Sequence, residues 1–171
     1  MKNKIFLFCL MVFGVLAMPS CTYDSFEEES ILGEIPNSSE AAFVRFDNSV
    51  STVDATELDG SASVRVEFIF PIETDVTVNY TYSGTAVEGT DFTIDGGSGG
   101  SGSITVAHDA ASLTSNSADL TLNLLTDDTI DGMKDLTVTL TSASAADGTP
   151  INVGQAGMFT EVTFVIADSD M

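Results

Sequence analysis

The sequence predicts an all-β fold, a seven-stranded antiparallel β-sandwich, and three observations favour that class. From residue 41 onward, apolar and polar residues alternate with a period of two, as expected where one face of a strand packs on a core. The alternating stretches are rich in Val, Leu, Phe, Tyr and Thr, which favour strands. No extended stretch after the N-terminal segment carries the apolar stripe of a helix. Short half-buried strands at this spacing are typical of an immunoglobulin-like sandwich.

The seven strands can be placed by their alternation and by the turn residues between them. The stretch "SVRVEFIF" puts its valines and Phe68 on one face, and "DVTVNYTY" puts Tyr80 and Tyr82 on the core side. The Gly/Ser-rich segment 96–102 and the Ser/Ala-rich segment 109–119 are interpreted as flexible loops. The expected strands cover residues 41–47, 61–70, 75–82, 102–107, 117–125, 134–142 and 158–167.

Residues 1–20 are predicted to be a lipoprotein signal peptide. Lys2 and Lys4 precede an apolar run at residues 5–17 that is too short to cross a membrane. The segment ends in Met-Pro-Ser-Cys, which resembles the cleavage box of bacterial lipoproteins, where the cysteine receives lipid. Lipid on Cys21 would anchor the chain to a membrane, because each buried methylene contributes about 0.8 kcal/mol. The alternative is an ordinary secreted protein with a free cysteine at its mature N-terminus.

Residues 21–40 are predicted to be an acidic flexible tether, and residues 41–171 the folded domain. The tether holds three consecutive glutamates, Glu27 to Glu29. This run resembles the acidic tags that direct some Gram-negative lipoproteins to the outer face of the outer membrane. We therefore expect an outer membrane lipoprotein at the cell surface. A spacer that is merely solvated is the alternative.

The acidic balance limits the classes of partner. The chain carries a formal charge of −21, and loss of Lys2 and Lys4 with the signal peptide leaves 26 acidic residues against three basic ones, a charge of −23. A chain this negative repels nucleic acid and anionic lipid, and it favours cations or basic partners. We expect a protein or glycan partner of unknown identity, beside the membrane that the lipid enters.

Acidic residues gather in connections that should meet at one end of the sandwich. If successive strands alternate in direction, every second connection emerges at the same end. Carboxylates about 4 Å apart repel by roughly 1 kcal/mol even in bulk water, and calcium accepts six to eight oxygen ligands in irregular geometry. The sole histidine, His108, falls at the other end, which disfavours transition metals. The alternative is a set of polar turns whose acids supply only solubility. The acids brought together are Asp54, Glu57, Asp59, Glu88, Asp91, Asp127, Asp128, Asp131, Asp168 and Asp170.

Three segments resemble the Calx-β domain family over residues 42–170. They are "VTVNYTYSGTAVEGTDFTI", "LLTDDTIDGMKDLTVTL" and "VTFVIADSD", which resemble the family's strand–turn signature, its acidic segment before a strand, and its closing segment. The resemblance implies a seven-stranded sandwich and, as in some members, calcium held by loops at one end. The ligands that it implies are Glu57, Asp91, Asp127, Asp128, Asp168 and Asp170.

The sequence departs from the family pattern at two positions of the acidic segment. Asp131 stands near the first glutamate of the pattern, where its shorter carboxylate can still reach an ion, so it joins the candidate metal ligands. Lys134 stands near the second. An ammonium group has no lone pair for a metal, so we expect Lys134 to neutralise part of the acidic cluster without an ion.

These residues favour one of three functions and disfavour the other two. The first is a lipid-anchored, surface-exposed Calx-β-like module for adhesion or protein assembly, with calcium at its acidic loops. The alternative is a glycan-binding lipoprotein of a polysaccharide-uptake system, which the absence of tryptophan disfavours. An enzyme is disfavoured, because the mature chain has one histidine, no internal cysteine and no nucleophile-elbow serine.

Overall fold

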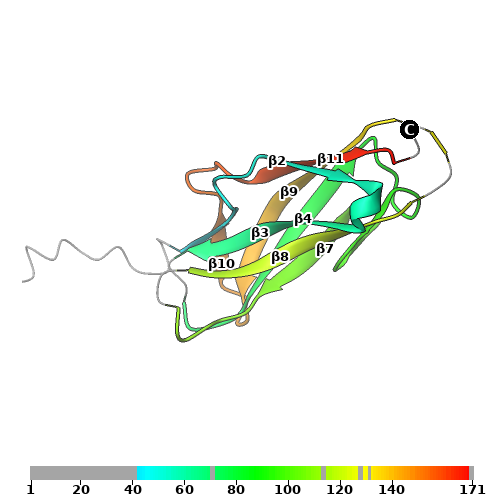
Figure 1. The fold of residues 1–171 in the computed structure, drawn as a ribbon. Coiled ribbons are helices and arrows are strands. Elements are labelled where there is room, and N and C mark those ends of the chain that lie inside the picture. The colour runs from blue at the N-terminus through cyan, green and yellow to red at the C-terminus, as the bar shows by residue number, and fades with distance from the viewer. Residues whose placement is uncertain (1–41, 70–71, 113–114, 127–128, 131, 170–171) are drawn as a thin grey trace, which may run out of the picture. The chain divides into compact units, whose positions relative to one another are not determined.

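Two β-sheets packed face to face form the part of the chain that the structure describes (Figure 1). This computed structural model describes residues 42–69, 72–112, 115–126, 129–130 and 132–169, all within the compact unit Pro36–Met171. The predicted signal peptide, the tether and Cys21 lie outside the described residues. Among the described residues, no helix is long and apolar enough to cross a membrane.

Eleven strands and one short 3-10 helix make up the described part. They are β1 (Phe43–Phe46), β2 (Thr52–Thr56), the helix η2 (Glu57–Asp59), β3 (Ser61–Ile69), β4 (Val76–Gly84), β5 (Phe92–Ile94), β6 (Gly97–Ser98), β7 (Ser101–Val106), β8 (Ser115–Leu124), β9 (Lys134–Ala145), β10 (Pro150–Val153) and β11 (Glu161–Ala167).

The sheets are ordered β5-β8-β3-β1 and β6-β7-β4-β9-β11-β2, and β10 pairs with both β9 and β1. Figure 1 shows β3 and β8 crossing in front of β4, β7 and β9. All pairs are antiparallel except β1–β10 and β2–β11. These two are parallel because β10 and β11 both run antiparallel to β9, while β1 and β2 follow one another in a single direction. The all-β sandwich is confirmed.

The predicted number of seven strands was too low. Strands β2 and β10 are short, and each pairs with a strand far away in the sequence, so alternation alone does not reveal them. The segment 96–102 is a hairpin of β6 and β7 rather than a loop, and β8 begins at Ser115, inside a predicted loop. Tyr80 explains the hairpin's glycines, because its hydroxyl donates to the Asp95 carbonyl at 2.8 Å and a Cβ on Gly97 would lie 2.7 Å from the hydroxyl oxygen.

The alternating residues form the core between the sheets, as predicted. Val66 and Phe68 of β3 are fully buried, and Tyr80 and Tyr82 of β4 are 1% and 8% exposed. The Tyr82 ring meets Phe92 edge to face, with ring centroids 5.9 Å apart. Burial of a large side chain contributes about 1.5–3 kcal/mol, so these rows hold the two sheets together. Because Tyr80 and Tyr82 are buried in the core, their rings cannot stack on a sugar.

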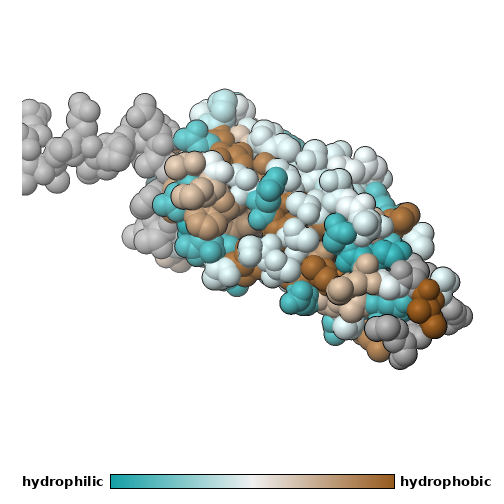
Figure 2. All heavy atoms as spheres, turned by 90° about the horizontal axis from the view of Figure 1, so that it is seen from above, coloured by the Kyte–Doolittle hydropathy of each residue, from teal (hydrophilic) through white to brown (hydrophobic). Residues whose placement is uncertain are grey.

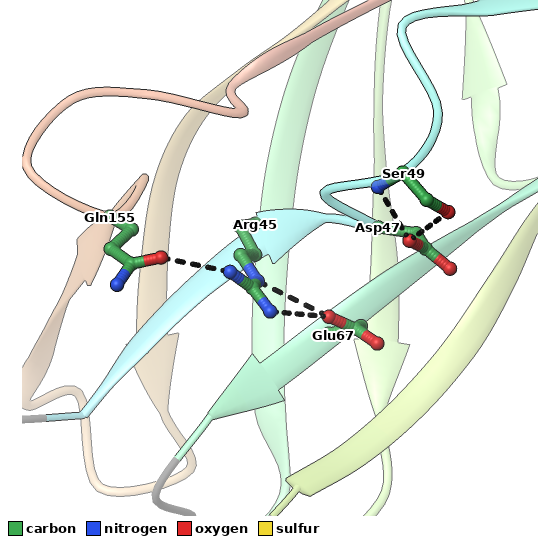
Figure 3. Close-up of polar contacts among 5 residues, drawn as sticks. All are labelled: Arg45, Asp47, Ser49, Glu67 and Gln155. Carbon is green, nitrogen blue, oxygen red and sulfur yellow. Dashed lines mark hydrogen bonds and ion pairs between the residues drawn. The ribbon is translucent and has the colours of Figure 1, made fainter.

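Arg45 fastens β1 to β3 and to the β10–β11 connection. Its Nε and Nη2 each lie 3.2 Å from Oε2 of Glu67, and Nη1 donates to Oε1 of Gln155 at 2.9 Å (Figure 3). The guanidinium also lies 5.8 Å from the ring centre of Phe43 and 5.7 Å from that of Phe159. Guanidinium groups favour such planar pairing and stacking. This Arg45 cluster fixes the side of the sandwich where the chain crosses from one sheet to the other.

The strand register brings four chain segments to one end of the sandwich. Thr56 of β2 pairs with Ala167 of β11, and Ile166 pairs with Lys134 of β9. In the other sheet the end of β8 meets the start of β3. The β2–β3, β4–β5 and β8–β9 connections therefore emerge together with the segment after β11, as strand alternation predicts. We call the described part of this end the acidic tip: residues 57–60, 85–91, 125–126, 129–130, 132–135 and 168–169. It lies beside the C label in Figure 1.

Candidate functional site

Glu57 is the first residue of η2, and its side chain is buried although the helix lies at the surface. The backbone N–H of Thr56 donates to Oδ2 of Asp59 at 2.7 Å, which caps the helix, and Gly60 ends it with a φ of 70°. This turn exposes Asp59 and leaves Glu57 only 4% exposed. Oε2 of Glu57 accepts a hydrogen bond from the Ser169 hydroxyl at 3.0 Å. The helix therefore directs one carboxylate inward against the end of β11.

Asp91 closes the β4–β5 connection and is 2% exposed. Its Oδ2 accepts the N–H of Val87 at 2.5 Å, and its carbonyl oxygen accepts the N–H of Leu125 at 2.9 Å. The ammonium of Lys134 lies 3.8 Å from the same Oδ2, with the lysine side chain only 18% exposed. An ion pair withdrawn from water in this way is screened much less than a surface pair. Asp91 thus joins the two sheets at the tip through Lys134.

Asp168 follows β11 directly and is 7% exposed. Its Oδ2 accepts the N–H of Gly132 at 3.0 Å, from the β8–β9 connection. The parallel strands β2 and β11 end at the same level, because Thr56 pairs with Ala167. The residue that follows each strand is acidic: Glu57 after β2 and Asp168 after β11. The register therefore sets two buried acids side by side at the end of neighbouring strands.

Three of the seven predicted metal ligands lie at the acidic tip. Glu57 and Asp91 come from two connections, and Asp168 comes from the segment after β11. Another predicted member of the acidic cluster, Glu88, is engaged elsewhere, because its Oε2 accepts hydrogen bonds from the Tyr82 hydroxyl at 2.7 Å and from the N–H of Gly99 at 2.9 Å. The remaining predicted ligands, Asp127, Asp128, Asp131 and Asp170, lie outside the described residues.

Comparison with known proteins agrees with this arrangement of strands and loops. The Calx-beta domain profile matches residues 38–170. The chain belongs to the Calx-beta domain family. No curated protein matches the sequence.

Solved structures place the Calx-beta domain among the Calx CBD folds. The apo-form Calx CBD1 domain aligns with a TM-score of 0.55 and 21% identity, over 75% of this chain and 98% of that one. CBD12 from CALX1.2 gives 0.54 and 21%, over 74% of this chain and 44% of its own length. The Calx CBD2 domain gives 0.50 and 16%, over 74% and 86%. At these identities the likeness establishes the fold.

The donor atoms of the Calx-beta tip suit a hard cation in type, and the described ones alone do not complete a site. Carboxylate oxygens are the ligands that calcium prefers, in sets of six to eight. Within the described ranges, no group of three or more His, Cys, Asp or Glu side chains is placed to hold a metal ion. Asp91 is paired with Lys134, as the sequence predicted for part of the cluster. Glu57 and Asp168 are the other two buried carboxylates of the tip.

The alternation of strands did not predict how the β4–β5 connection is held against β9. The carbonyl oxygen of Asp135 accepts the N–H groups of Thr85 and Ala86 at 2.9 and 3.0 Å. The Thr85 hydroxyl also donates to Oδ1 of Asp135 at 2.5 Å and accepts the Asp135 N–H at 2.8 Å. A Cβ on Gly84 would overlap the Asp135 carbonyl, so this glycine permits close approach of two backbones. The "GTA" triplet at residues 84–86 is the sequence feature that could have indicated this contact.

His108 lies away from the acidic tip, as predicted. Its backbone N–H donates to Oδ1 of Asp75 at 2.8 Å, at the opposite end of β4. Within the described residues its buried Nδ1 has no hydrogen-bond partner. The chain has one histidine, and its two cysteines precede the domain.

Proposed function

We propose that this Calx-beta domain is a lipid-anchored module at the surface of a bacterial outer membrane, where it supports adhesion or protein assembly and binds calcium at its acidic tip. It acts as a binding module and not as an enzyme. The observation that carries the calcium proposal is the burial of three carboxylates, Glu57, Asp91 and Asp168, at one end of the sandwich.

Electrostatics favours a cation beside Glu57 and Asp168. Removing a carboxylate from water costs several kcal/mol unless a charge or several donors compensate. Lys134 lies beside Asp91. The hydroxyl of Ser169 donates to Glu57, and the N–H of Gly132 donates to Asp168. A divalent ion would be held by the oxygens of Glu57 and Asp168, together with oxygens from outside the described residues. Its charge would stabilise both carboxylates at once.

The names of similar proteins support the same proposal. One of them is the "calcium binding domain CBD12 of CALX1.1", which aligns with a TM-score of 0.53 and 21% identity, over 74% of this chain and 44% of that one. The Calx-beta domain shares its fold with that protein. Glycan capture has no supporting observation here, because Tyr80 and Tyr82 are buried.

Calcium should raise the melting temperature of the domain. A ligand that binds only the folded state stabilises it by RT ln(1 + [L]/Kd), about 2.7 kcal/mol at one hundred times Kd, which corresponds to several degrees for a domain of this size. We expect that rise on going from a chelator to millimolar calcium, followed by calorimetry. Glu57→Gln should remove most of it. Glu73→Gln, at an exposed glutamate of the β3–β4 connection, should keep it. An identical melting curve with and without calcium would refute the calcium proposal.

The lipid anchor rests on Cys21 and the apolar segment before it. We expect cells that express the full chain to incorporate radioactive palmitate into it, and Cys21→Ser to abolish the label and release the protein into the soluble fraction. Protease added to intact cells should degrade the anchored protein, because the proposal places it at the surface. Unlabelled protein would leave an ordinary secreted domain, and protection from protease would place it on the periplasmic side.

A further inference from the structure

Exposed apolar side chains gather at the acidic tip. Among the described residues, five large hydrophobic side chains are more than half exposed, and only one of them, Met158, lies away from the tip. The described parts of the β3–β4, β7–β8 and β9–β10 connections, at the opposite end, contribute none. Scattered exposed apolar residues are ordinary, whereas their gathering marks an interaction surface. The four at the tip are Leu58, Val87, Ile130 and Met133, with exposures of 75%, 54%, 71% and 73%.

A shallow hollow of about 310 Å³ lies beside these side chains, on the outer face of β2 and β11. Its apolar lining comes from both strands and from Met133, and two exposed acids, Asp54 and Asp59, stand at its border. Figure 2 shows this pattern at one end of the molecule, where brown hydrophobic atoms lie beside teal hydrophilic ones. The apolar lining is formed by Ala55, Met133, Val165 and Ala167.

The strand that borders the hollow has a free edge. Within the described part of the chain, β2 pairs with β11 on one side and with no strand on the other. An edge strand presents backbone N–H and C=O groups to which another extended segment can add. Backbone pairing would place alternate side chains of such a segment over the outer face of β2, above the hollow.

We propose that the acidic tip docks an extended segment of a partner protein, laid along the free edge of β2, in which the side chains on the outer face of the sheet, every second residue, include both apolar and basic ones. This deepens the proposed role in protein assembly and rests on it, because it names the surface and the chemistry of the partner. The apolar side chains cover Leu58 and Met133 and enter the hollow. The basic ones face Asp54 and Asp59.

Charge selects this occupant over two others. The chain has a net charge of −21, so a second copy of the tip or an anionic bilayer meets like charge. A neutral bilayer would cover the apolar side chains and leave both the edge of β2 and the exposed acids without complement. A segment that carries apolar and basic side chains on one face complements all three features at once.

The test uses the full chain and two synthetic peptides in which every second residue is threonine. One has lysine and valine in turn at the remaining positions, and the other has glutamate and valine there. We expect titration calorimetry to show binding of the lysine peptide alone, and Leu58→Ser with Met133→Ser to weaken it about tenfold or more, as loss of about 1.4 kcal/mol requires. Met158→Ser, equally apolar and exposed but distant, should leave the affinity unchanged. Shifts of amide resonances in residues 52–59 of the parent should mark the binding edge.

Several results would overturn the proposal. Equal weakening by the tip and Met158 variants, or none by either, would mean diffuse attraction of a basic peptide to an acidic protein. Binding of the chain to phosphatidylcholine vesicles that the tip variant loses would assign the surface to a bilayer. A dimer in sedimentation that the tip variant loses would assign it to a second copy. The calcium shift in melting temperature, measured on the same tip variant, is expected to persist, so failure of either proposal is seen separately.

Discussion

The acidic tip and the Arg45 cluster use buried charge in opposite ways. At Arg45 one guanidinium pairs with one carboxylate and one amide, and it lies over two aromatic rings. At the tip three buried carboxylates share the region with Lys134. The first network is complete within the chain, and the second has acid in excess of the base that the structure describes. A closed network serves the fold, whereas the excess of buried acid is the charge that the proposed cation would offset.

The same contrast extends to the apolar side chains. Phe43 and Phe159 at the Arg45 cluster are partly covered by the guanidinium that they flank. Leu58 and Met133 at the tip are about three-quarters exposed. Evolution of a stable fold alone would favour covering them, because exposed apolar area costs about 25 cal/mol per Å². The tip is therefore the region where the proposed ion and the proposed partner would both bind.

Breaking the Arg45 cluster should have the largest effect on stability. Arg45→Ala removes the partner of Glu67, which is 19% exposed, and the packing between two rings. We expect a loss of about 2–3 kcal/mol in the free energy of unfolding, below the 3–5 kcal/mol of a fully buried pair because some solvent reaches this one. Urea denaturation measures it.

Arg65 offers the matched control for that prediction. It lies 3.9 Å from Asp119, and both side chains are more than half exposed. Arg65→Ala should change the free energy of unfolding by less than about 0.5 kcal/mol. Losses of equal size at Arg45 and Arg65 would show that the Arg45 cluster is not the closed network described above.

Lys134→Met should have a smaller effect, and one that depends on calcium. The variant keeps the apolar stem and leaves Asp91 buried without this ammonium. In chelator we expect a loss of about 1–2 kcal/mol, the cost of a buried acceptor that loses its partner. In millimolar calcium the loss should shrink, because removal of the ammonium charge makes the tip more negative and so strengthens the proposed ion site. Lys134→Arg, which keeps the charge, is the control. A loss that is the same in both solutions would separate Lys134 from any cation site.

Much of the sandwich could be predicted because burial of one face imposes a period of two. Strands such as β3, β4, β8 and β9 carry that pattern over many residues. Strands β2 and β10 are too short to show it; β2 pairs with the distant β11, and β10 pairs with the distant β1 as well as with the neighbouring β9. The Gly/Ser-rich composition of the β6–β7 hairpin predicts a loop, because composition does not reveal that its glycines make room for the Tyr80 hydroxyl.

The acidic tip was predictable in outline and not in detail. Strand alternation brings acids from several connections together, which the burial of Glu57, Asp91 and Asp168 at one end confirms. The parallel β2–β11 pair, which sets Glu57 beside Asp168, requires a register that no local pattern encodes. The partner of Lys134 likewise follows from packing of the two sheets, since Asp91 lies on the other side of the core.

The smallest expected effect is on the pH dependence of stability, and it arises from Asp47, which lies beside the Arg45 cluster. The pKa of Asp47 is lowered from its ordinary 3.8, first by the Ser49 hydroxyl, which donates to Oδ1 at 2.7 Å, and then by the Ser49 N–H at 2.9 Å (Figure 3). A carboxyl whose pKa is depressed in the folded state stabilises it above the unfolded value. That contribution is lost as pH falls through the lower folded pKa.

Ser49→Ala should therefore weaken the acid dependence of stability on this side of the molecule. Because solvent screens Asp47, the change should stay below about 0.5 kcal/mol, measured as the urea midpoint between about pH 5 and pH 2. Ser103→Ala, at an exposed serine of β7, is the control and should leave the profile unchanged. If Ser49→Ala also leaves it unchanged, Asp47 does not contribute to acid sensitivity, and that sensitivity belongs to other carboxylates of the chain.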